Sequence, residues 1–367
     1  MVFEGFLLFY DPPKQDTAKT ITDLGTLGVE LKVITGDNWR VTRHVAANTG
    51  FKQMGIVTGE EIGKMDDAAL AHAVNKNGLF AEVDPNQKER IIRALRRTGH
   101  VVGYMGDGIN DAPALHAADV SISVDTAVDV AKEAADFVLL RQSLDVLRQG
   151  ILEGRRTFSN TLKYVYSTTS ANFGNMFSMA GLTLFLPFLP LLAKQILLNN
   201  FLSDFPAMTI ADDAVDPEMV EAPHRWNVGS IRNFMVVFGL ISSVFDYITF
   251  AVLLFVFKTA ENEFQTGWFI ESLFTELFIL LVVRTNRPLI KSKPGLLLLI
   301  STILVAVFSL ALPYLASLSE PFGFVPLPAP LMVTLVLITL LYVAVNEVVK
   351  LYFFKQNGIL GKINPAL

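Results

Sequence analysis

The chain has 367 residues, of which 51% are hydrophobic and only 18% are charged, and its net charge is −5 at pH 7. A mean hydropathy of +0.44 is too high for a protein made only of soluble domains. The absence of cysteine excludes a disulfide-stabilised scaffold and thiolate metal sites. The small negative charge gives no indication of nucleic-acid binding, so no nucleic-acid partner is expected.

Charged residues are concentrated in the first part of the chain. Residues 1–157 carry 18 Lys and Arg and 22 Asp and Glu, which is more than half of all charges. This distribution predicts a soluble domain followed by a membrane domain. The first ten residues are apolar but lack a basic segment and a small-residue cleavage site, so they do not form a signal peptide.

The soluble part alternates short β-rich runs with helical patterns, which is typical of βαβ units and a parallel, Rossmann-like sheet. The expected strands are 5–10, 29–34, 79–83, 101–104, 120–124 and 137–140. The expected helices are 14–27, 39–49, 67–77 and 86–98. In such a fold the functional site lies at the carboxyl ends of the strands.

Four turns fall at those strand ends. They are Asp11–Pro13, Thr35–Asp37, Asp84–Lys88 and Gly106–Asp111. The last turn combines two glycines, which allow close approach of a ligand, with two carboxylates, which suit Mg²⁺. Lys88 can neutralise phosphoryl oxygens and Thr35 can donate a hydrogen bond to one. Together the turns indicate a phosphoryl-transfer site, where catalysis is mostly positioning and charge stabilisation.

These turns resemble the motifs of one family. Thr35-Gly36-Asp37 and the run Gly106–Leu115 (GDGINDAPAL) look like phosphorylation-domain motifs of P-type cation-transporting ATPases, and Asp11–Pro13 and Pro85…Lys88 resemble two further motifs. The resemblance implies a haloacid-dehalogenase-like fold and the use of ATP and Mg²⁺. It implies that Asp107, with Asp111, binds the catalytic Mg²⁺. It further implies that residues of the first three turns contact the phosphoryl group or the cofactor, namely Asp11, Thr35, Gly36, Asp37 and Lys88. It also implies that Asn110 and Asp111 hold the site together.

One departure from the family pattern is large. The nucleophile motif Asp-Lys-Thr-Gly-Thr and the actuator motif Thr-Gly-Glu-Ser do not occur in this sequence. We therefore expect a C-terminal part of such a pump, which needs the missing N-terminal part as its partner. The 367-residue chain alone is expected not to hydrolyse ATP.

Six apolar stretches follow, near 164–184, 188–210, 234–257, 268–283, 295–315 and 331–353, and each is long enough, or nearly so, to cross about 30 Å of hydrocarbon. The predicted organisation is a phosphorylation domain at 1–142, a stalk helix at 143–163 and six transmembrane helices within 164–367. Basic residues gather before the first stretch, between the fourth and fifth, and after the last. The positive-inside rule then places both termini in the cytoplasm, in a multi-pass protein of the plasma membrane in contact with lipid.

Polar residues at membrane depth are candidates for a cation site. Asn172 and Asn175 are spaced i, i+3 in the first stretch, and Asp204 in the second precedes Pro206, which frees a backbone carbonyl. Their oxygens suit Mg²⁺ or Ca²⁺ rather than copper or zinc. Asp246 is a weaker candidate, as a remote cation ligand, a structural pair or part of an exit path. Glu271, beside Trp268 near a span end, is expected to be interfacial.

Within the family, the runs at 170–175, 243–247 and 267–271 are similar to the magnesium-importing branch. A calcium pump of this family usually has more carboxylates in its two central helices than the single Asp204 found here. A proton pump can also operate with one membrane aspartate, so that alternative stays open. Two further alternatives are a membrane-anchored phosphatase without transport and a short protein that regulates a complete pump. The polar cluster at 172–204 favours a pump over an anchor.

Overall fold

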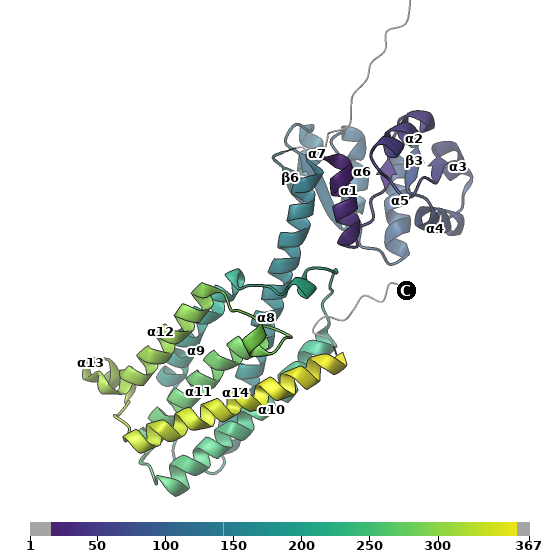
Figure 1. The fold of residues 1–367 in the computed structure, drawn as a ribbon. Helices are drawn as coiled ribbons and strands as arrows, with labels where there is room; N and C mark the ends of the chain where they lie inside the picture. Colours follow the sequence, from purple (N-terminus) through teal and green to yellow (C-terminus); the bar gives the residue numbers. More distant parts are fainter. Residues whose placement is uncertain (1–15, 142, 358–367) are drawn as a thin grey trace, which may run out of the picture. The chain divides into compact units, whose positions relative to one another are not determined.

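The computed structural model describes residues 16–141 and 143–357, which form two compact units that divide between Glu153 and Gly154 (Figure 1). The first unit contains alternating strands and helices, and the second is built of long helices. The predicted strand at 5–10 and the turn with Asp11 lie outside the described residues.

The first unit has six short strands: β1 Val33–Ile34, β2 Ile56–Thr58, β3 Leu79–Ala81, β4 Gly103–Met105, β5 Val120–Val124 and β6 Phe137–Leu139. Its helices are α1 Thr17–Thr26, α2 Trp39–Asn48, α3 Gly59–Lys64, α4 Asp67–Lys76, α5 Pro85–Arg97, η1 Ile109–Asp111, α6 Ala112–Ala117 and α7 Asp129–Glu133. The prediction missed β2 and α3, although Thr58 and Glu61 carry a capping-box signal that marks the start of α3.

All described strand pairs are parallel, as predicted. One sheet has the order β1-β3-β2 and the other has the order β4-β5-β6. Val33 pairs with Leu79 in the first sheet, and Gly103 pairs with Val120 in the second. Parallel pairing places the carboxyl ends of neighbouring strands at one edge of each sheet, so the loops that follow β1, β3 and β4 can supply a common site.

Local sequence signals explain where the site-forming helices begin. Asp84 caps α5 by accepting a 2.8 Å hydrogen bond from the Gln87 N–H, and Gln87 returns a bond to the Asp84 N–H. Pro85 occupies the first turn of α5, where a missing N–H has no cost. The Asn38 side chain caps α2 in the same way through the Arg40 N–H. These caps fix the loops that end β3 and β1.

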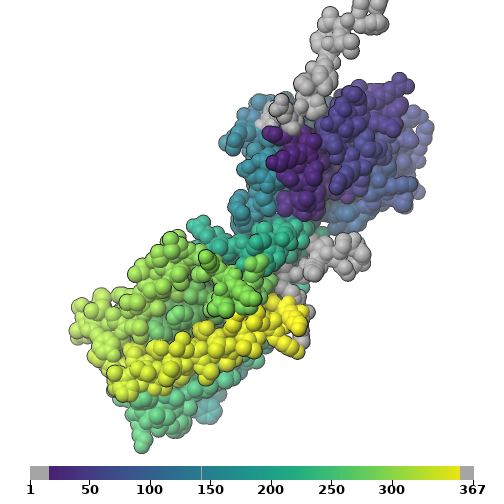
Figure 2. Space-filling model, viewed as in Figure 1, coloured from purple at the N-terminus to yellow at the C-terminus, as the bar shows by residue number. Residues whose placement is uncertain are grey.

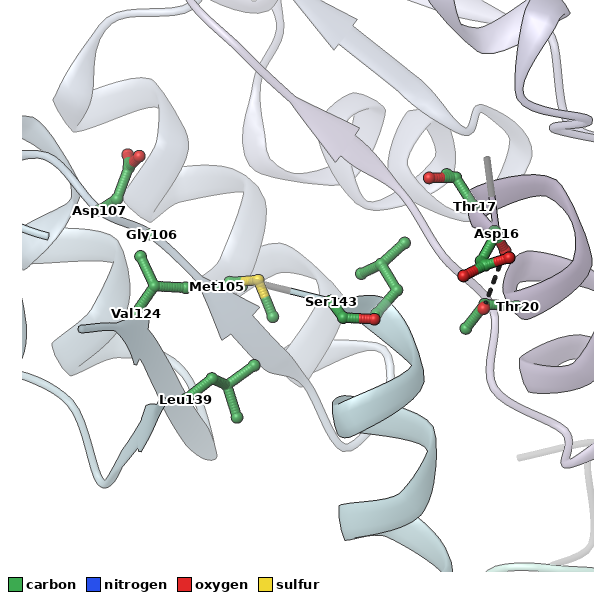
Figure 3. Close-up of a pocket in the computed structure, with 10 residues that line it drawn as sticks. Asp16, Thr17, Thr20, Met105, Gly106, Asp107, Val124, Leu139 and Ser143 are labelled. Atoms are coloured by element: carbon green, nitrogen blue, oxygen red, sulfur yellow. Dashed lines mark hydrogen bonds between the residues drawn. The ribbon is translucent and has the colours of Figure 1, made fainter. Parts of the chain in front are cut away.

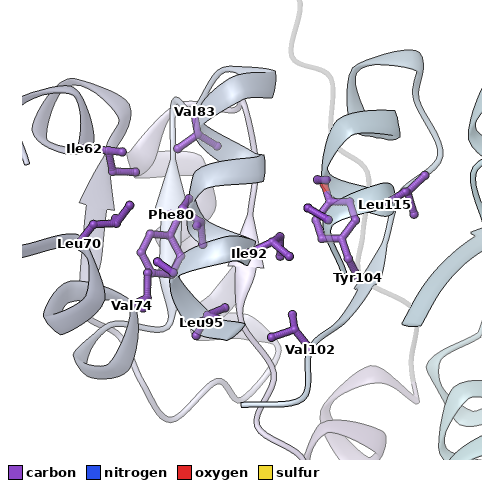
Figure 4. Packing of buried hydrophobic residues seen from close by; sticks show 14 of the residues in the cluster. Ile62, Leu70, Val74, Phe80, Val83, Ile92, Leu95, Val102, Tyr104 and Leu115 are labelled. Carbon is purple, nitrogen blue, oxygen red and sulfur yellow. The ribbon is translucent and has the colours of Figure 1, made fainter. Parts of the chain in front are cut away.

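A single hydrophobic core joins the two sheets (Figure 4). Phe80 of β3, Ile92 of α5, Tyr104 of β4 and Leu115 of α6 all belong to one cluster of buried side chains. Because α5 packs against both α6 and η1, its first turn is held against the loop that follows β4. The core thereby positions Lys88 next to Asp111.

Helix α8 Leu144–Leu182 begins in the first unit and continues into the second. The other helices of the second unit are α9 Ala193–Thr209, α10 Val228–Ala251 with the π-helical turn η4 Val252–Val256, α11 Glu261–Val283, α12 Leu296–Ala311 with η6 Leu312–Tyr314, α13 Ala316–Ser319 and α14 Ala329–Asn357. Short 3₁₀ turns lie in its loops: η2 Ile210–Asp212, η3 Pro217–Met219, η5 Leu289–Lys291 and η7 Glu320–Phe322. Helix α8 runs without a break for 39 residues, about 58 Å.

Helices occur at all six predicted membrane stretches, and four of those in the described residues are long and apolar enough to cross a membrane. These four are Val228–Val256, Glu261–Val283, Leu296–Tyr314 and Ala329–Lys355. Helix α9 spans 17 residues, or about 25 Å, and includes Lys194 and Asp204. The count of six spans is therefore not confirmed.

Helix α11 forms the centre of the second unit. It packs against α9, α10, α12 and α14, and most of its side chains are buried. In contrast, α12 and α14 present apolar side chains such as Leu304 and Leu341 to the outside, and both helices lie on the outer surface in Figure 2. An apolar exterior around a buried central helix is the arrangement expected of helices in lipid.

Candidate functional site

The loop after β4 is built around the carboxylate of Asp111. Asp111 Oδ2 accepts hydrogen bonds from the Asp107 and Gly108 N–H groups, at 3.2 and 3.1 Å. A Cβ atom at Gly106 would lie 2.5 Å from the Asp111 Cβ, so only glycine fits this tight turn. The Ser123 hydroxyl donates to the Gly106 carbonyl oxygen at 2.9 Å and ties the loop to β5.

The second oxygen of Asp111 joins this loop to α5. Lys88 Nζ lies 2.7 Å from Asp111 Oδ1, and the Tyr104 hydroxyl donates to the same oxygen at 2.8 Å. Burial by itself would raise the pKa of Asp111, but the hydrogen bonds from Lys88, Tyr104 and the Gly108 N–H outweigh it and lower that pKa. Burial, together with the bond to Asp111, raises the pKa of Tyr104. Asp111 is therefore a carboxylate and Tyr104 a neutral phenol at neutral pH.

Asp107 and Asn110 lie in the same loop with exposed side chains. Asp107 lines a cavity of about 600 Å³ together with Asp16, Thr17, Met105 and Gly106 (Figure 3). Asp107 contributes only backbone atoms to the hydrogen bonds within the described part of the chain, so its carboxylate is available to a ligand. Within residues 16–141 and 143–357, no three His, Asp or Glu side chains group closely enough to hold a metal ion.

The Thr35–Asp37 loop is fixed by the loop after β3. The Asp37 N–H donates to Thr35 Oγ1 at 3.1 Å, and the Val83 N–H donates to the Thr35 carbonyl oxygen at 3.2 Å. Glu82, with a left-handed φ of 59°, accepts a 2.7 Å hydrogen bond from the Asn38 side chain. Gly36 and Asp37 are exposed. The structure therefore joins Thr35 to the strand that leads to Lys88, but no hydrogen bond among the described residues links Thr35 to Asp107 or Asp111.

A polar cluster lies inside the helical unit, centred on Glu276 of α11. Glu276 Oε1 accepts hydrogen bonds from the Asn175 side chain of α8 at 2.5 Å and from the Asn199 side chain of α9 at 2.9 Å. Asn199 Oδ1 is buried and has no hydrogen-bond partner among the described residues. Asn175 is one of the cation ligands predicted from the sequence, whereas Glu276 and Asn199 are not among those predicted ligands.

The other predicted cation ligands on α8 and α9 are not in this cluster. Asn172 and Asp204 have exposed side chains, and no hydrogen bond within residues 16–141 and 143–357 joins either of them to Glu276. Pro206 lies inside α9, as expected, and is buried. Asn200 and the neighbouring Phe201 and Phe205 are exposed like Asp204. This face of α9 is therefore not covered by the described residues.

Asp246 forms a second polar cluster with α8 and α11. Its carboxylate accepts hydrogen bonds from Ser178 Oγ at 2.6 Å and from Trp268 Nε1 at 2.9 Å. Glu271, one turn after Trp268, is fully buried and faces Asp246. The prediction that Glu271 is interfacial is therefore wrong, because α11 is the central helix and its middle turns do not reach the surface.

A buried ion-pair network ties the loop after α9 to α8 and to the end of α11. Lys163 Nζ lies 2.7 Å from Asp213 Oδ2, and Arg284 Nε lies 3.6 Å from Asp213 Oδ1. The Asn160 side chain donates to the Asp213 carbonyl oxygen at 3.1 Å. Burial lowers the pKa of Lys163 even though Asp213 opposes the shift. The sequence analysis did not single out these residues.

Two family models match the chain. A haloacid dehalogenase-like hydrolase model matches residues 3–119, and a model described as the C-terminus of cation-transporting ATPases matches residues 188–352. The first match covers the strands and loops that carry Thr35, Lys88 and Asp107. The second covers the helices from α9 to most of α14, including Glu276.

Curated relatives match almost the whole chain. It is 43% identical over 363 residues, 98% of its length, to the magnesium-transporting ATPase, P-type 1, of Salmonella typhimurium and to that of Escherichia coli K12. It is 32% identical over 276 residues, 73% of its length, to calcium-transporting ATPase 1 of Bacillus cereus, of which it covers 30%. The chain spans about 40% of the length of the magnesium-transporting relatives.

These matches agree with the motifs and with the architecture. The haloacid-dehalogenase-like unit carries the loops at 35–37 and 106–115, and the helical unit carries four helices able to cross a membrane. The chain is accordingly a multi-pass membrane protein. On this evidence it belongs to the P-type cation-transporting ATPases.

Proposed function

We propose that the chain contributes the C-terminal part of an ATP-driven pump that imports Mg²⁺ across the plasma membrane. The observation that carries the proposal is the Glu276 cluster, in which a carboxylate and two asparagines meet between helices of the membrane unit. An anchor without transport has no need of such a cluster. The 43% identity to magnesium-transporting ATPases supports Mg²⁺ as the cation.

In the first unit, the residues present fit a phosphoryl group with a bound Mg²⁺. Family membership implies that ATP and Mg²⁺ are used, and the metal would supply neutralisation of the phosphoryl charge. Asp107 would hold the metal, because its carboxylate is exposed in a cavity, whereas both oxygens of Asp111 already accept hydrogen bonds. Asp111 then keeps the loop and Lys88 in place.

Lys88 and Thr35 would contact the phosphoryl oxygens. One N–H of the Lys88 ammonium is directed at Asp111, which leaves two donors for a ligand. Thr35 Oγ1 accepts from the Asp37 N–H, so its hydroxyl hydrogen remains free to donate. Gly36, Asp37 and Asn110 border these groups in the two loops. Asp11, outside the described residues, stays a predicted contact.

In the membrane unit, Glu276 would bind the transported cation together with amide oxygens. Asn175 and Asn199 donate to Glu276 through their side-chain N–H groups, which leaves their side-chain oxygens for other ligands. Asn199 Oδ1 is buried without a hydrogen bond to any described residue. Mg²⁺ prefers such oxygen ligands and keeps several waters, so few protein ligands suffice. Asn172 of α8 and Asp204 of α9, whose side chains are exposed, would complete the site against the remaining helices of the pump.

The basic residues at the helix ends support an orientation in which both termini are cytoplasmic, by the positive-inside rule. In that orientation α8 connects the two units as a stalk. The 367-residue chain alone remains predicted to be inactive towards ATP, because it lacks the Asp-Lys-Thr-Gly-Thr nucleophile motif.

The proposal is tested with a chimera that joins the N-terminal part of the Salmonella typhimurium relative to this chain. We expect it to restore growth of a magnesium-uptake-deficient strain at limiting Mg²⁺, and Glu276→Gln and Asp204→Asn to abolish the rescue. The control is Asn200→Ala, on the same helix as Asp204. Full rescue by Glu276→Gln would remove that residue from the site, and stimulation of ATPase activity by Ca²⁺ or by pH alone would overturn Mg²⁺ as the cation.

A further inference from the structure

A second group of polar side chains lies between α8, α10 and α11, one helical turn away from the Glu276 cluster. It contains Asp246 and Thr249 of α10, Trp268 and Glu271 of α11, and Ser178 of α8. Asp246, Thr249 and Glu271 are each at most 1% exposed. Two carboxyl groups are thus enclosed together between three helices of the second unit.

Several oxygens of this group lack a well-formed hydrogen bond among the described residues. Both oxygens of Glu271 and the hydroxyl oxygen of Thr249 are buried without a bond of good geometry, although Glu271 lies next to both Asp246 and Thr249. Asp246 differs, because Ser178 and Trp268 each donate to one of its oxygens. Buried polar atoms without partners are costly, so an oxygen-binding ligand at this point would remove a substantial penalty.

The charge of the group points to a cation. The titratable groups that face the two carboxyls are Tyr247 on α10, Tyr342 on α14 and Glu276 on α11, and no Lys or Arg of the described residues pairs with them. Two carboxyl groups without a basic partner inside a membrane are compensated either by a shared proton or by a bound cation. One divalent cation balances two negative charges, and carboxylate and hydroxyl oxygens are ligands that a hard divalent cation accepts.

The positions of these residues along the helices place the group at a different membrane depth from the Glu276 cluster. Asp246 and Glu271 lie ten residues from the turn that joins η4 to α11, about 15 Å in, near the middle of the apolar layer. Ser178 is three residues beyond Asn175 on α8, and Glu271 is five residues before Glu276 on the antiparallel α11. Both helices therefore place this group on the same side of the Glu276 cluster.

We propose that Asp246, Glu271 and Thr249, with Ser178, form a second binding site for a divalent cation, separate from the Glu276 cluster. The choice of Mg²⁺ as the probe rests on the proposed function, but the site itself does not. Trp268 reports on it directly, because its indole N–H donates to Asp246. A cation bound to Asp246 changes the charge next to the indole and hence its emission.

The experiment uses the 367-residue chain in lipid nanodiscs with Trp39→Phe and Trp226→Phe, so that Trp268 is the remaining tryptophan. Its emission is recorded while MgCl₂ replaces choline chloride at constant ionic strength. We expect a saturable change, with a midpoint that Glu271→Gln raises at least about tenfold, because a charged ligand is lost. Thr249→Val, which keeps the shape of the side chain, should raise the midpoint by a smaller factor.

Asn200→Ala, which changes an exposed side chain of α9, is the control, and its midpoint should stay within about twofold of the unmutated chain, a change of less than about 0.5 kcal/mol. Far-UV circular dichroism confirms that each variant folds. The site is overturned if Mg²⁺ produces no saturable change, if Glu271→Gln and Thr249→Val both titrate like the unmutated chain, or if Na⁺ or K⁺ gives the same response. Loss of the signal in Glu276→Gln alone would assign it to the proposed transport site instead, whereas failure of the growth rescue leaves this result unaffected.

Discussion

Lys88 and Asp111 lie 2.7 Å apart and connect the first turn of α5 to the loop that follows β4. Their side chains are 14% and 10% exposed, so the pair is mostly removed from water. Asp111 also holds two N–H groups of its own loop and the hydroxyl of Tyr104. One carboxylate thus fixes both the loop that carries Asp107 and the lysine that we propose to contact a phosphoryl group, so Asp111 acts as a positioning residue in the proposed site.

Asp111→Asn should destabilise the first unit by about 3 kcal/mol, because it leaves Lys88 buried without its partner. Tyr104→Phe, which removes one hydrogen bond and little volume, should cost about 1 kcal/mol. Urea unfolding followed by the emission of Trp39, the one tryptophan in residues 1–153, measures both values. Equal costs for the two variants would contradict a special role for the Lys88 pair.

The same pair gives a pH dependence of stability. The pKa of Asp111 is lowered in the folded state, so its contribution is fully present above the unfolded-state value of about 3.9 and is lost as the pH falls through the folded pKa. The stability difference between the unmutated chain and Asp111→Asn should therefore be constant from about pH 5 to 7 and shrink below about pH 4. A difference that persisted at the lowest pH would show that packing, not ionisation, is responsible.

The Lys163–Asp213 pair allows a test of the pH dependence of stability on the alkaline side of neutrality. Asp213→Asn should destabilise the helical unit by about 3–5 kcal/mol at pH 7, since Lys163 is left buried and charged. Burial lowers the pKa of Lys163, so the unfolded state binds more protons than the folded state and stability rises with pH. Thermal unfolding of the variant at pH 7 and 9.5 should show the higher midpoint at pH 9.5.

A double variant serves as the control for this pair. Lys163→Met combined with Asp213→Asn removes both charges. The double variant should therefore recover part of the stability that Asp213→Asn loses, and its stability should no longer depend on pH between 7 and 9.5. Identical behaviour of the single and double variants would mean that Asp213 acts through Arg284 or the loop backbone rather than through Lys163.

Much of the first unit follows from its sequence, because its signals are local. The caps at Asp84 and Asn38, and the apolar runs before each turn, predict elements that the structure contains within a few residues. Short elements such as β2 escape this reasoning, since three residues carry too little pattern. The pairing of Lys88 with Asp111 joins a loop after β3 of one sheet to a loop after β4 of the other, and α5 brings the two loops together by packing against α6 and η1.

The membrane site is harder to predict because it depends on which faces of separate helices meet. Asn199 and Asp204 are five residues apart and so lie about 140° apart around α9, which explains why one faces Glu276 and the other is exposed. The sequence does not show which face of α9 packs against α11, so it cannot decide whether Asn199 or Asp204 contacts Glu276. No sequence motif lies next to Glu276, so its position in the cluster becomes clear only from its contacts with Asn175 of α8 and Asn199 of α9.

The chain as given should form no acid-stable phosphoenzyme and show no ATP hydrolysis above background. The reason is chemical, since the sequence lacks the Asp-Lys-Thr-Gly-Thr motif in which the family places its nucleophile. Incubation with γ-labelled ATP and acid precipitation measures the label on the protein, with the chimera as the positive control. Stable label on the 367-residue chain would overturn this expectation.

Asn199 and Asn200 provide a matched pair for the cation site, because they are adjacent in α9 but only Asn199 contacts Glu276. In the chimera, Asn199→Ala removes a donor to the carboxylate and an unpartnered oxygen, whereas Asn200→Ala changes an exposed side chain. Hydrogen bonds between membrane helices contribute about 0.6 kcal/mol on average, and bonds to charged groups contribute about 1.5–3 kcal/mol. We therefore expect Asn199→Ala to raise the Mg²⁺ concentration for half-maximal ATPase activity by about three- to tenfold. Asn200→Ala should leave it within about twofold. The reverse order would place the site on the exposed face of α9 with Asp204, and Glu276 would then be a structural partner of its two asparagines.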